Sequence, residues 1–109
     1  MFKCSVCGYI HDGDEAPARC PKCGAVQDRF EKLSEEAAAL IDKSRITNSI
    51  HMQLINDLEN IALLAEEGLE EDLDPNCNKI FERLLLCATE SIQSIKAEMQ
   101  GHMNKGKWG

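Results

Sequence analysis

Aromatic residues make up only 5% of this 109-residue chain, whereas hydrophobic residues of all kinds make up 43%. A core with few rings and many Ala, Leu and Ile side chains favours helices over a β-sandwich. The sequence also lacks any apolar run near the roughly 18 residues of a membrane span, and it opens Met-Phe-Lys-Cys without the basic and apolar regions of a secretory signal. We therefore expect a cytoplasmic protein with no membrane partner.

The chain has no excess of positive charge. Its 19 acidic and 12 basic residues give a formal net charge of −7. Residues 1–33 are neutral, so the excess lies in residues 34–109 and is densest from Glu66 to Asp74. Such a surface repels phosphate, which argues against nucleic-acid binding. We interpret the acidic run as a solvated loop, with electrostatic docking of a basic redox partner as the alternative.

The composition changes near residue 34. Three of the seven glycines and two of the three prolines fall within residues 1–24, where no helical or strand period is sustained. From Ser34, neither residue type appears until Gly68. The sequence therefore predicts two domains: residues 1–33, made of turns and very short strands, and residues 34–109, made of helices.

The first helix is expected to begin at Ser34, whose side chain can cap it, and to end at Gly68 as the C′ residue. The segment from Ser44 to Ser49 has poor helix propensity and is the place where a break or kink could occur, but we predict one long helix across it. Asp74-Pro75 predicts the start of a second helix, because aspartate is a good N-cap and proline fits the first helical position.

The second helix is expected to fray near Gly101. The short link from Leu69 to Asp74 is typical of antiparallel neighbours and predicts a helical hairpin. Apolar residues recur at helical spacing in both helices: Leu40, Ile41, Ile50, Leu54, Leu58, Ile61, Ala65, Ile80, Phe81, Leu84, Ala88, Ile92, Ile95 and Met99. Two helices alone leave much of this apolar surface in water, so we expect a homodimer that closes a four-helix bundle.

Four of the six cysteines form two CxxC pairs, Cys4/Cys7 and Cys20/Cys23, and each pair is followed by a glycine. A CxxC turn lets both sulfurs face one ion, and a glycine at positive φ lets backbone N–H groups turn toward them. Two disulfides or a thioredoxin-like redox pair are the alternatives, but paired motifs in a chain without a secretory signal favour metal. The predicted site is one tetrahedral S₄ centre, suited to iron or zinc.

The stretch Phe2-Lys-Cys-Ser-Val-Cys-Gly-Tyr-Ile-His-Asp-Gly-Asp-Glu-Ala-Pro-Ala-Arg-Cys-Pro-Lys-Cys-Gly resembles the small rubredoxin-like module of rubrerythrins. Cys-Gly-Tyr, Glu-Ala-Pro, Cys-Pro-Lys-Cys and the twelve residues between the pairs carry the resemblance, which extends to about residue 33. It implies one iron per chain at Cys4, Cys7, Cys20 and Cys23, and transfer of single electrons. The position of the module at the N-terminus resembles a reversed domain order among rubrerythrin relatives.

The leading hypothesis is therefore an iron-binding, rubredoxin-like electron-transfer protein without enzymatic activity of its own. One alternative is a structural zinc ribbon whose helices bind other proteins. A weaker one is a rubrerythrin-like diiron peroxidase, whose sites need Glu-x-x-His motifs. The chain has no such motif: Asn48 lies three residues before His51, and Met99 three before His102.

Other residues with reactive or ligating side chains fit a structural interpretation better. His51 lies near the apolar stripe and is expected to be packed. Glu98 could share a helix face with His102, where a solvated helix end is the simpler interpretation. Cys77 lies at the start of the second helix, where the helix dipole could lower its pKa, and Cys87 lies mid-helix. Both cysteines are interpreted as small core or interface residues and not as reactive thiols.

Overall fold

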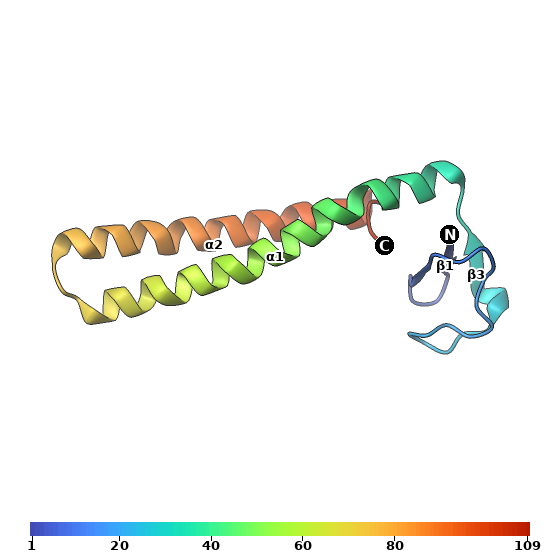
Figure 1. The fold of residues 1–109 in the computed structure, drawn as a ribbon, viewed down its shortest axis with the longest axis horizontal. Helices are drawn as coiled ribbons and strands as arrows, with labels where there is room; N and C mark the ends of the chain where they lie inside the picture. The colour runs from blue at the N-terminus through green and yellow to red at the C-terminus, as the bar shows by residue number, and fades with distance from the viewer. The chain divides into compact units, whose positions relative to one another are not determined.

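The computed structural model describes residues 1–109 and contains a small sheet followed by two long helices (Figure 1). Its elements in chain order are β1 (Phe2–Cys4), β2 (Ile10–His11), the 3₁₀ helix η1 (Gln27–Arg29), β3 (Phe30–Lys32), α1 (Glu35–Glu71) and α2 (Pro75–Asn104). The predicted fold class, short strands and turns followed by a helical hairpin, is confirmed. Neither helix carries an apolar stretch long enough to span a bilayer.

The chain forms two compact units. The first contains residues 1–45 together with residues 106–109, and the second contains residues 46–105. The first unit thus includes the start of α1 and the end of the chain, and the second holds the hairpin. The division predicted at residues 33 and 34 stays a prediction.

The sheet places the first cysteine pair. Strand β1 is central, in the order β2-β1-β3, and both of its neighbours are antiparallel to it. Cys4 is the last residue of β1 and pairs with Phe30 of β3, while Phe2 pairs with His11 of β2. The turn that carries Cys4 and Cys7 therefore begins at the end of the central strand, which is hydrogen-bonded to a neighbour on each side.

Helix α1 begins as predicted and continues without a break. The Ser34 hydroxyl accepts a hydrogen bond from the N–H of Ala37 at 3.2 Å and caps the first turn. The prediction of one long helix is confirmed, because α1 runs unbroken through residues 44–49 despite their poor helix propensity. Ser44 is buried there, and its hydroxyl donates to the Leu40 carbonyl at 2.7 Å, so its polar group is satisfied within the helix.

The end of α1 differs from the prediction. The helix continues past Gly68 to Glu71, and Asp72, with φ of 46°, takes the left-handed conformation expected at a C′ residue. Gly68 serves a different purpose inside the helix. A Cβ atom added there would lie 2.5 Å from the ring of Phe81 in α2, so the glycine makes room for that ring.

Helix α2 begins as predicted. The Asp74 carboxylate accepts hydrogen bonds from the N–H groups of Asn76 at 2.8 Å and Cys77 at 2.9 Å, and Pro75 occupies the first turn. These bonds, led by the one from the Cys77 backbone, hold the pKa of Asp74 below its ordinary value despite partial burial. The helix ends at Asn104, three residues beyond the fraying point expected near Gly101.

The two helices pack through positions that recur every seven residues. On α1 one such series is Asn48, Ile55 and Ala62 and a second is His51, Leu58 and Ala65; on α2 they are Leu85, Ile92 and Met99, and Phe81, Ala88, Ile95 and His102. Ala65 and Ala88 are 2% and 1% exposed, so small side chains lie where the helices approach closely. The other apolar positions that the sequence singles out, including Ile50, Leu54 and Leu84, remain exposed.

The end of the chain belongs to the same unit as the cysteine-rich segment. The guanidinium of Arg45 in α1 donates to the Asp12 carboxylate at 2.8 Å and the Asp42 carboxylate at 3.2 Å, and its Nε donates to the Gly109 carbonyl at 2.9 Å. Gly109 lies so close to Ile10 and Ile41 that a Cβ atom there would meet them at 2.6 and 3.0 Å. One arginine therefore joins three segments that are distant in the sequence.

We predict that Gly68→Ala destabilises the hairpin, although alanine is the better helix former by about 1 kcal/mol. The new methyl group would displace the Phe81 ring. Gly101→Ala is the matched control, since a Cβ atom there meets no atom within 4 Å, and it should stabilise the protein. Thermal unfolding followed by circular dichroism measures both changes. Equal gains from both substitutions would show that Gly68 and Phe81 are not in close contact.

We also predict that the cap of α2 weakens in acid. Because the pKa of Asp74 lies below its ordinary value of 3.8, the carboxylate stabilises the folded state above that pH, and this contribution is lost as the pH falls through the lowered pKa. Asp74→Asn keeps an acceptor oxygen without the charge. The stability difference between wild type and Asp74→Asn should therefore be largest near neutrality and shrink in acid. A difference that does not change with pH would contradict this role of the charge.

Candidate metal centre

Two nearly identical backbone turns, residues 4–8 and 20–24, carry the four cysteines, and we call each turn a knuckle. In the first, Gly8 N–H donates to the Cys4 carbonyl at 2.9 Å; in the second, Gly24 N–H donates to the Cys20 carbonyl at 2.8 Å. Both glycines have positive φ, 75° and 74°, and a Cβ atom on either would meet nothing within 4 Å. Glycine is therefore needed here for its backbone conformation and not for space, as the paired motifs predict.

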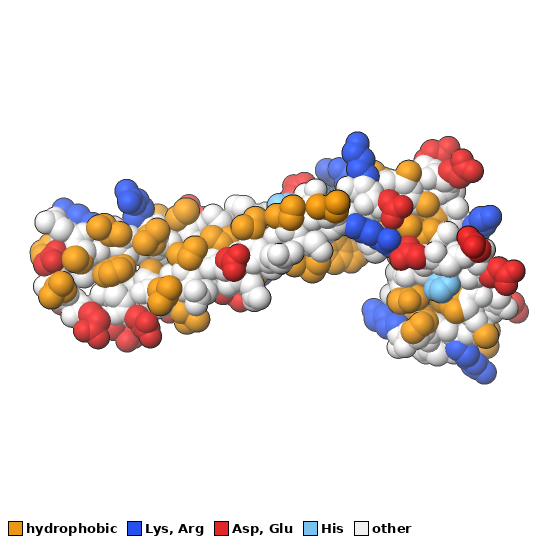
Figure 2. Space-filling view, viewed as in Figure 1, with side chains coloured by type: hydrophobic (Ala, Val, Ile, Leu, Met, Phe, Trp, Pro, Cys, Tyr) orange, Lys and Arg blue, Asp and Glu red, His pale blue; other side chains and the backbone are white.

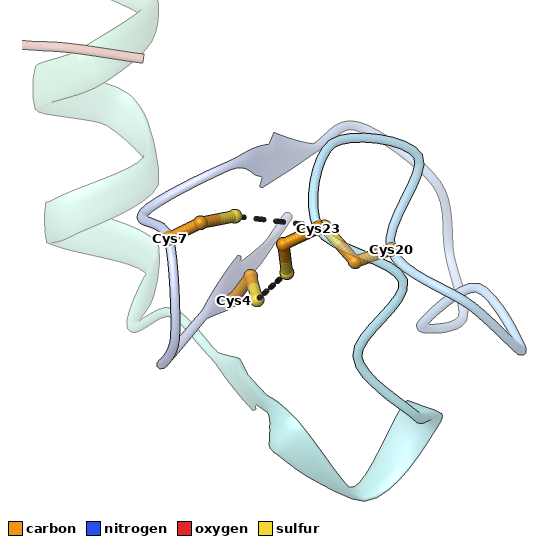
Figure 3. Close-up of side chains that lie close together, drawn as sticks. All are labelled: Cys4, Cys7, Cys20 and Cys23. Carbon is orange, nitrogen blue, oxygen red and sulfur yellow. Dashed lines mark hydrogen bonds between the residues drawn. The ribbon is translucent and has the colours of Figure 1, made fainter.

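The structure brings all four predicted cysteines together (Figure 3). Their sulfur atoms all lie within 4.8 Å of one another, with Cys4 Sγ 3.8 Å from Cys23 Sγ and Cys7 Sγ 3.6 Å from Cys20 Sγ. These separations are far longer than the roughly 2.05 Å of a disulfide, and all four thiols are free. The disulfide interpretation is therefore wrong.

The spacing of the sulfurs can be tested against a metal. Four ligands at the Zn–S distance of about 2.3 Å, placed at the corners of a tetrahedron, lie about 3.8 Å apart. The Cys4–Cys23 and Cys7–Cys20 sulfur distances, 3.8 and 3.6 Å, match this edge. An all-sulfur tetrahedron fits zinc or iron and is unsuited to magnesium or calcium, which prefer oxygen. The cluster is thus a Cys₄ metal-binding site, and its geometry alone does not distinguish the two metals.

The four sulfurs differ in their exposure. Cys4 and Cys20, the first cysteine of each pair, are 1% and 3% exposed, whereas Cys7 is half-buried and Cys23 is exposed. One edge of the tetrahedron is therefore covered by the protein, and the opposite edge faces solvent.

Backbone N–H groups point at the two buried sulfurs. Burial raises the pKa of Cys20, but hydrogen bonds from the N–H groups of Cys23 and Lys22 outweigh it and, with the neighbouring thiols, lower the pKa to about 7. The pKa of Cys4 is also lowered: burial again opposes the shift, and the N–H groups of Cys7 and Val6 prevail. Each knuckle thus stabilises a thiolate at its first cysteine.

At Cys23, a backbone hydrogen bond is not enough to stabilise a thiolate. The N–H of Ala25 lowers the pKa of Cys23, but burial and the adjacent thiols of Cys7, Cys20 and Cys4 outweigh it and raise the pKa to about 12. Several negative charges cannot share so small a volume without a cation. The donor set therefore calls for a positive ion at its centre.

The other candidate residues lie in the hairpin. His102 is 8% exposed, with its Nδ1 2.6 Å from Oδ1 of Asn48 and its Nε2 3.1 Å from the Glu98 carboxylate. The interpretation of His102 as part of a solvated helix end is wrong. The predicted packing of His51 is confirmed, since its ring meets that of His102 edge to face at 6.2 Å between centroids. The seven-residue spacing of Ala88, Ile95 and His102 is the signal that could have placed His102 inside.

The two remaining cysteines are not part of the cluster. The Cys77 thiol donates to the Asp74 carboxylate at 3.2 Å, and this bond, together with burial and the negative charge of Asp74, raises the pKa of Cys77. The carboxylate thus outweighs the helix dipole, which was expected to lower it. Cys87 is exposed on α2. The raised pKa of Cys77 argues against a reactive thiolate at the start of α2.

Comparisons with known proteins find a match to a family model and a match to a curated relative. Residues 2–31 match the family model described as rubrerythrin, rubredoxin-like domain. Reverse rubrerythrin-1 of Clostridium acetobutylicum is 47% identical to this chain over 45 residues, which cover 41% of the chain and 25% of that protein. The match therefore spans about a quarter of the length of this curated relative. No solved structure shows a significant match to the chain.

We predict that serine at any one of Cys4, Cys7, Cys20 or Cys23 weakens metal binding by more than the roughly 10–100-fold typical of losing an outer-shell hydrogen bond. The segment should then unfold, because besides sulfur it buries little that could hold it together. Metal analysis and hydrogen exchange measure the two effects. Cys77→Ser and Cys87→Ser are the controls and should keep the metal. Full metal occupancy in all four variants would contradict the assignment.

Proposed function

We propose that residues 1–33 hold one iron ion through Cys4, Cys7, Cys20 and Cys23, and that the protein carries single electrons in a reducing, cytoplasmic compartment. The observation that carries this proposal is a sulfur tetrahedron with one covered edge and one exposed edge. The similarity of residues 2–31 to a rubredoxin-like domain supports it. An iron ion bound by four thiolates can change its charge by one, from Fe³⁺ to Fe²⁺, without changing its ligands.

The chain can stabilise the negative charge that reduction adds. The four N–H groups that point at Cys4 and Cys20 form hydrogen bonds that strengthen as the sulfurs become more electron-rich. The Arg19 guanidinium donates to the Gly24 carbonyl at 3.3 Å, which places a positive charge beside the second knuckle. Because these groups are fixed by the backbone turns, little rearrangement accompanies the change of charge.

The exposed edge gives an electron a short route to a partner. Cys23 is exposed and Cys7 half-exposed, so a docked redox protein can approach these sulfurs without moving the chain. Val6, in the first knuckle, and Val26, just after the second, are 56% and 47% exposed and offer apolar contacts for a transient complex. Such a partner would bind here, while the N–H groups act on the covered edge.

A structural zinc site is the second candidate function. It is supported by the near absence of an apolar core in residues 1–33, where the fully buried side chains are those of Cys4 and Cys20. A closed-shell zinc ion would link the knuckles as well as iron and would leave the hairpin as the functional part. The two proposals share their ligands and differ in redox activity.

The deciding experiment uses protein from cells supplied with both iron and zinc. We expect about one iron per chain, a visible colour from ferric thiolate, and reversible bleaching by one electron per chain. The Cys77→Ser/Cys87→Ser double variant should behave identically, because neither thiol belongs to the cluster. A colourless protein that holds zinc, accepts no electron and does not exchange its metal for iron would instead support the structural zinc site.

A further inference from the structure

The hairpin has one face that gathers exposed apolar residues, along α1 from Ile50 to Leu64 and along α2 from Cys77 to Cys87; beyond Cys87 the α2 side of this face continues with Ser91, Ser94 and Glu98. On α1, exposed apolar residues immediately precede buried-series residues in the sequence: Leu54 precedes Ile55, and Ile61 precedes Ala62. On α2, Leu84 precedes Leu85 in the same way. Because the helices are antiparallel, the positions that precede the buried series on each helix lie on the same side of the hairpin. Figure 2 shows hydrophobic side chains along both helices on the face it displays.

We define this apolar face by its side chains. It consists of Ile50, Leu54, Ile61 and Leu64 from α1 and Cys77, Ile80, Leu84 and Cys87 from α2. Leu64 is 56% exposed and Ile50 50%, so they are not covered by the hairpin itself. Asp57 is the one charged residue among the α1 positions that face this way between Ile50 and Leu64.

The opposite side of the hairpin has a different character. Its apolar residues are interrupted by charged and polar ones, and the side contains Met52, Glu59, Leu63, Glu66, Lys79, Glu82, Leu86, Thr89, Gln93 and Lys96. Leu63 and Leu86, at 62% and 58%, are more exposed than Leu54 and Leu84, at 42% and 40%. They stand among polar neighbours, so they do not form a continuous surface. Only the apolar face has the length and composition of an interface.

We propose that a second copy of this chain packs on the apolar face, with the two hairpins antiparallel, and completes a four-helix bundle. A two-fold pairing brings the same face of both copies together, so it needs no complementary charges. That requirement fits a face of aliphatic side chains and thiols whose charged residues, Asp57 and Glu98, have the same sign. The proposal does not depend on which metal the cysteines hold.

The size of the face agrees with a stable dimer. From Ile50 to the turn, the face is about 35 Å long at 1.5 Å per residue, and two helices packed about 10 Å apart make it roughly 20 Å wide. Pairing two such faces buries on the order of 700 Å² from each copy, close to the roughly 800 Å² per partner of a standard interface.

The charges select the orientation. Acidic residues gather where the hairpin turns: Glu66, Glu67, Glu70, Glu71, Asp72 and Asp74. If both turns lay at one end of the bundle, two such clusters would repel each other. In the antiparallel arrangement the turns lie at opposite ends, several times further apart than the Debye length of about 8 Å at physiological salt. Repulsion between the clusters is then screened.

The test compares two double variants of the full-length, metal-loaded protein. Leu54→Glu/Leu84→Glu places charges on the apolar face, and Leu63→Glu/Leu86→Glu makes the same changes on the other side. We expect wild type and the second variant to be dimers by sedimentation equilibrium, and the first to raise the dimer Kd by about 100-fold or more. A monomeric wild type, or a first variant that dimerises like the control, would overturn the proposal.

A second measurement covers the case in which the first variant loses helicity. In a Cys77→Ser background, the exposed Cys87 should react with a thiol reagent more slowly as protein concentration rises, because dimerisation covers it. A thiol moved to the other side, by Cys87→Ser/Gln93→Cys, should react at a rate independent of concentration. Equal behaviour of the two thiols would contradict the proposed face. Efficient cross-linking between copies through Glu71→Cys at the turn would contradict the antiparallel orientation.

Discussion

The first 33 residues contain little that can be buried except sulfur. Their fully buried side chains belong to Cys4 and Cys20, and both valines near the knuckles are largely exposed. A segment of this size without a core relies on a metal or a covalent link for its fold. The pKa of Cys23, raised to about 12 by burial and the adjacent thiols, shows that the sulfurs cannot all be ionised by themselves. The cation is thus both the centre of the site and the substitute for a core.

The hairpin follows a different physical logic. Its two helices, of 37 and 30 residues, are far longer than the average helix, and from residue 46 onward they gain stability by packing on one another. Ala65, Ala88 and Gly68 allow close approach, and the larger Phe81 ring fills the space opposite the glycine. At the open end, Asn48 and His102 pair inside the interface. A slip of one helix along the other would separate that buried pair, so it helps to fix the register.

The sequence was informative where a local pattern has one physical meaning. Two CxxC turns with following glycines predicted the convergence of Cys4, Cys7, Cys20 and Cys23, and Asp74-Pro75 predicted the start of α2. It misled where tertiary contacts override a local preference. Gly68 looked like a helix end because the position of Phe81 cannot be read from propensity, and the poor propensity of residues 44–49 did not reveal the hydrogen bond that satisfies Ser44 inside α1. The contacts of Arg45 with Asp12 and Gly109 join residues far apart in the chain, so no local pattern encodes them.

The capped turn also has a consequence for how the hairpin folds. Near the turn, Gly68 and Phe81 meet across a short loop, whereas Asn48 and His102 at the open end are 54 residues apart in sequence. The entropy lost in closing a loop grows with its length, so the pairing is expected to start beside Asp74 and to advance toward the open end one helical turn at a time. Each step extends a structure already formed, which is the condition for rapid zipping. The order reverses when the hairpin opens: within residues 46–105 the open end separates first, and the Asn48–His102 pair is the first buried contact of that unit to meet water.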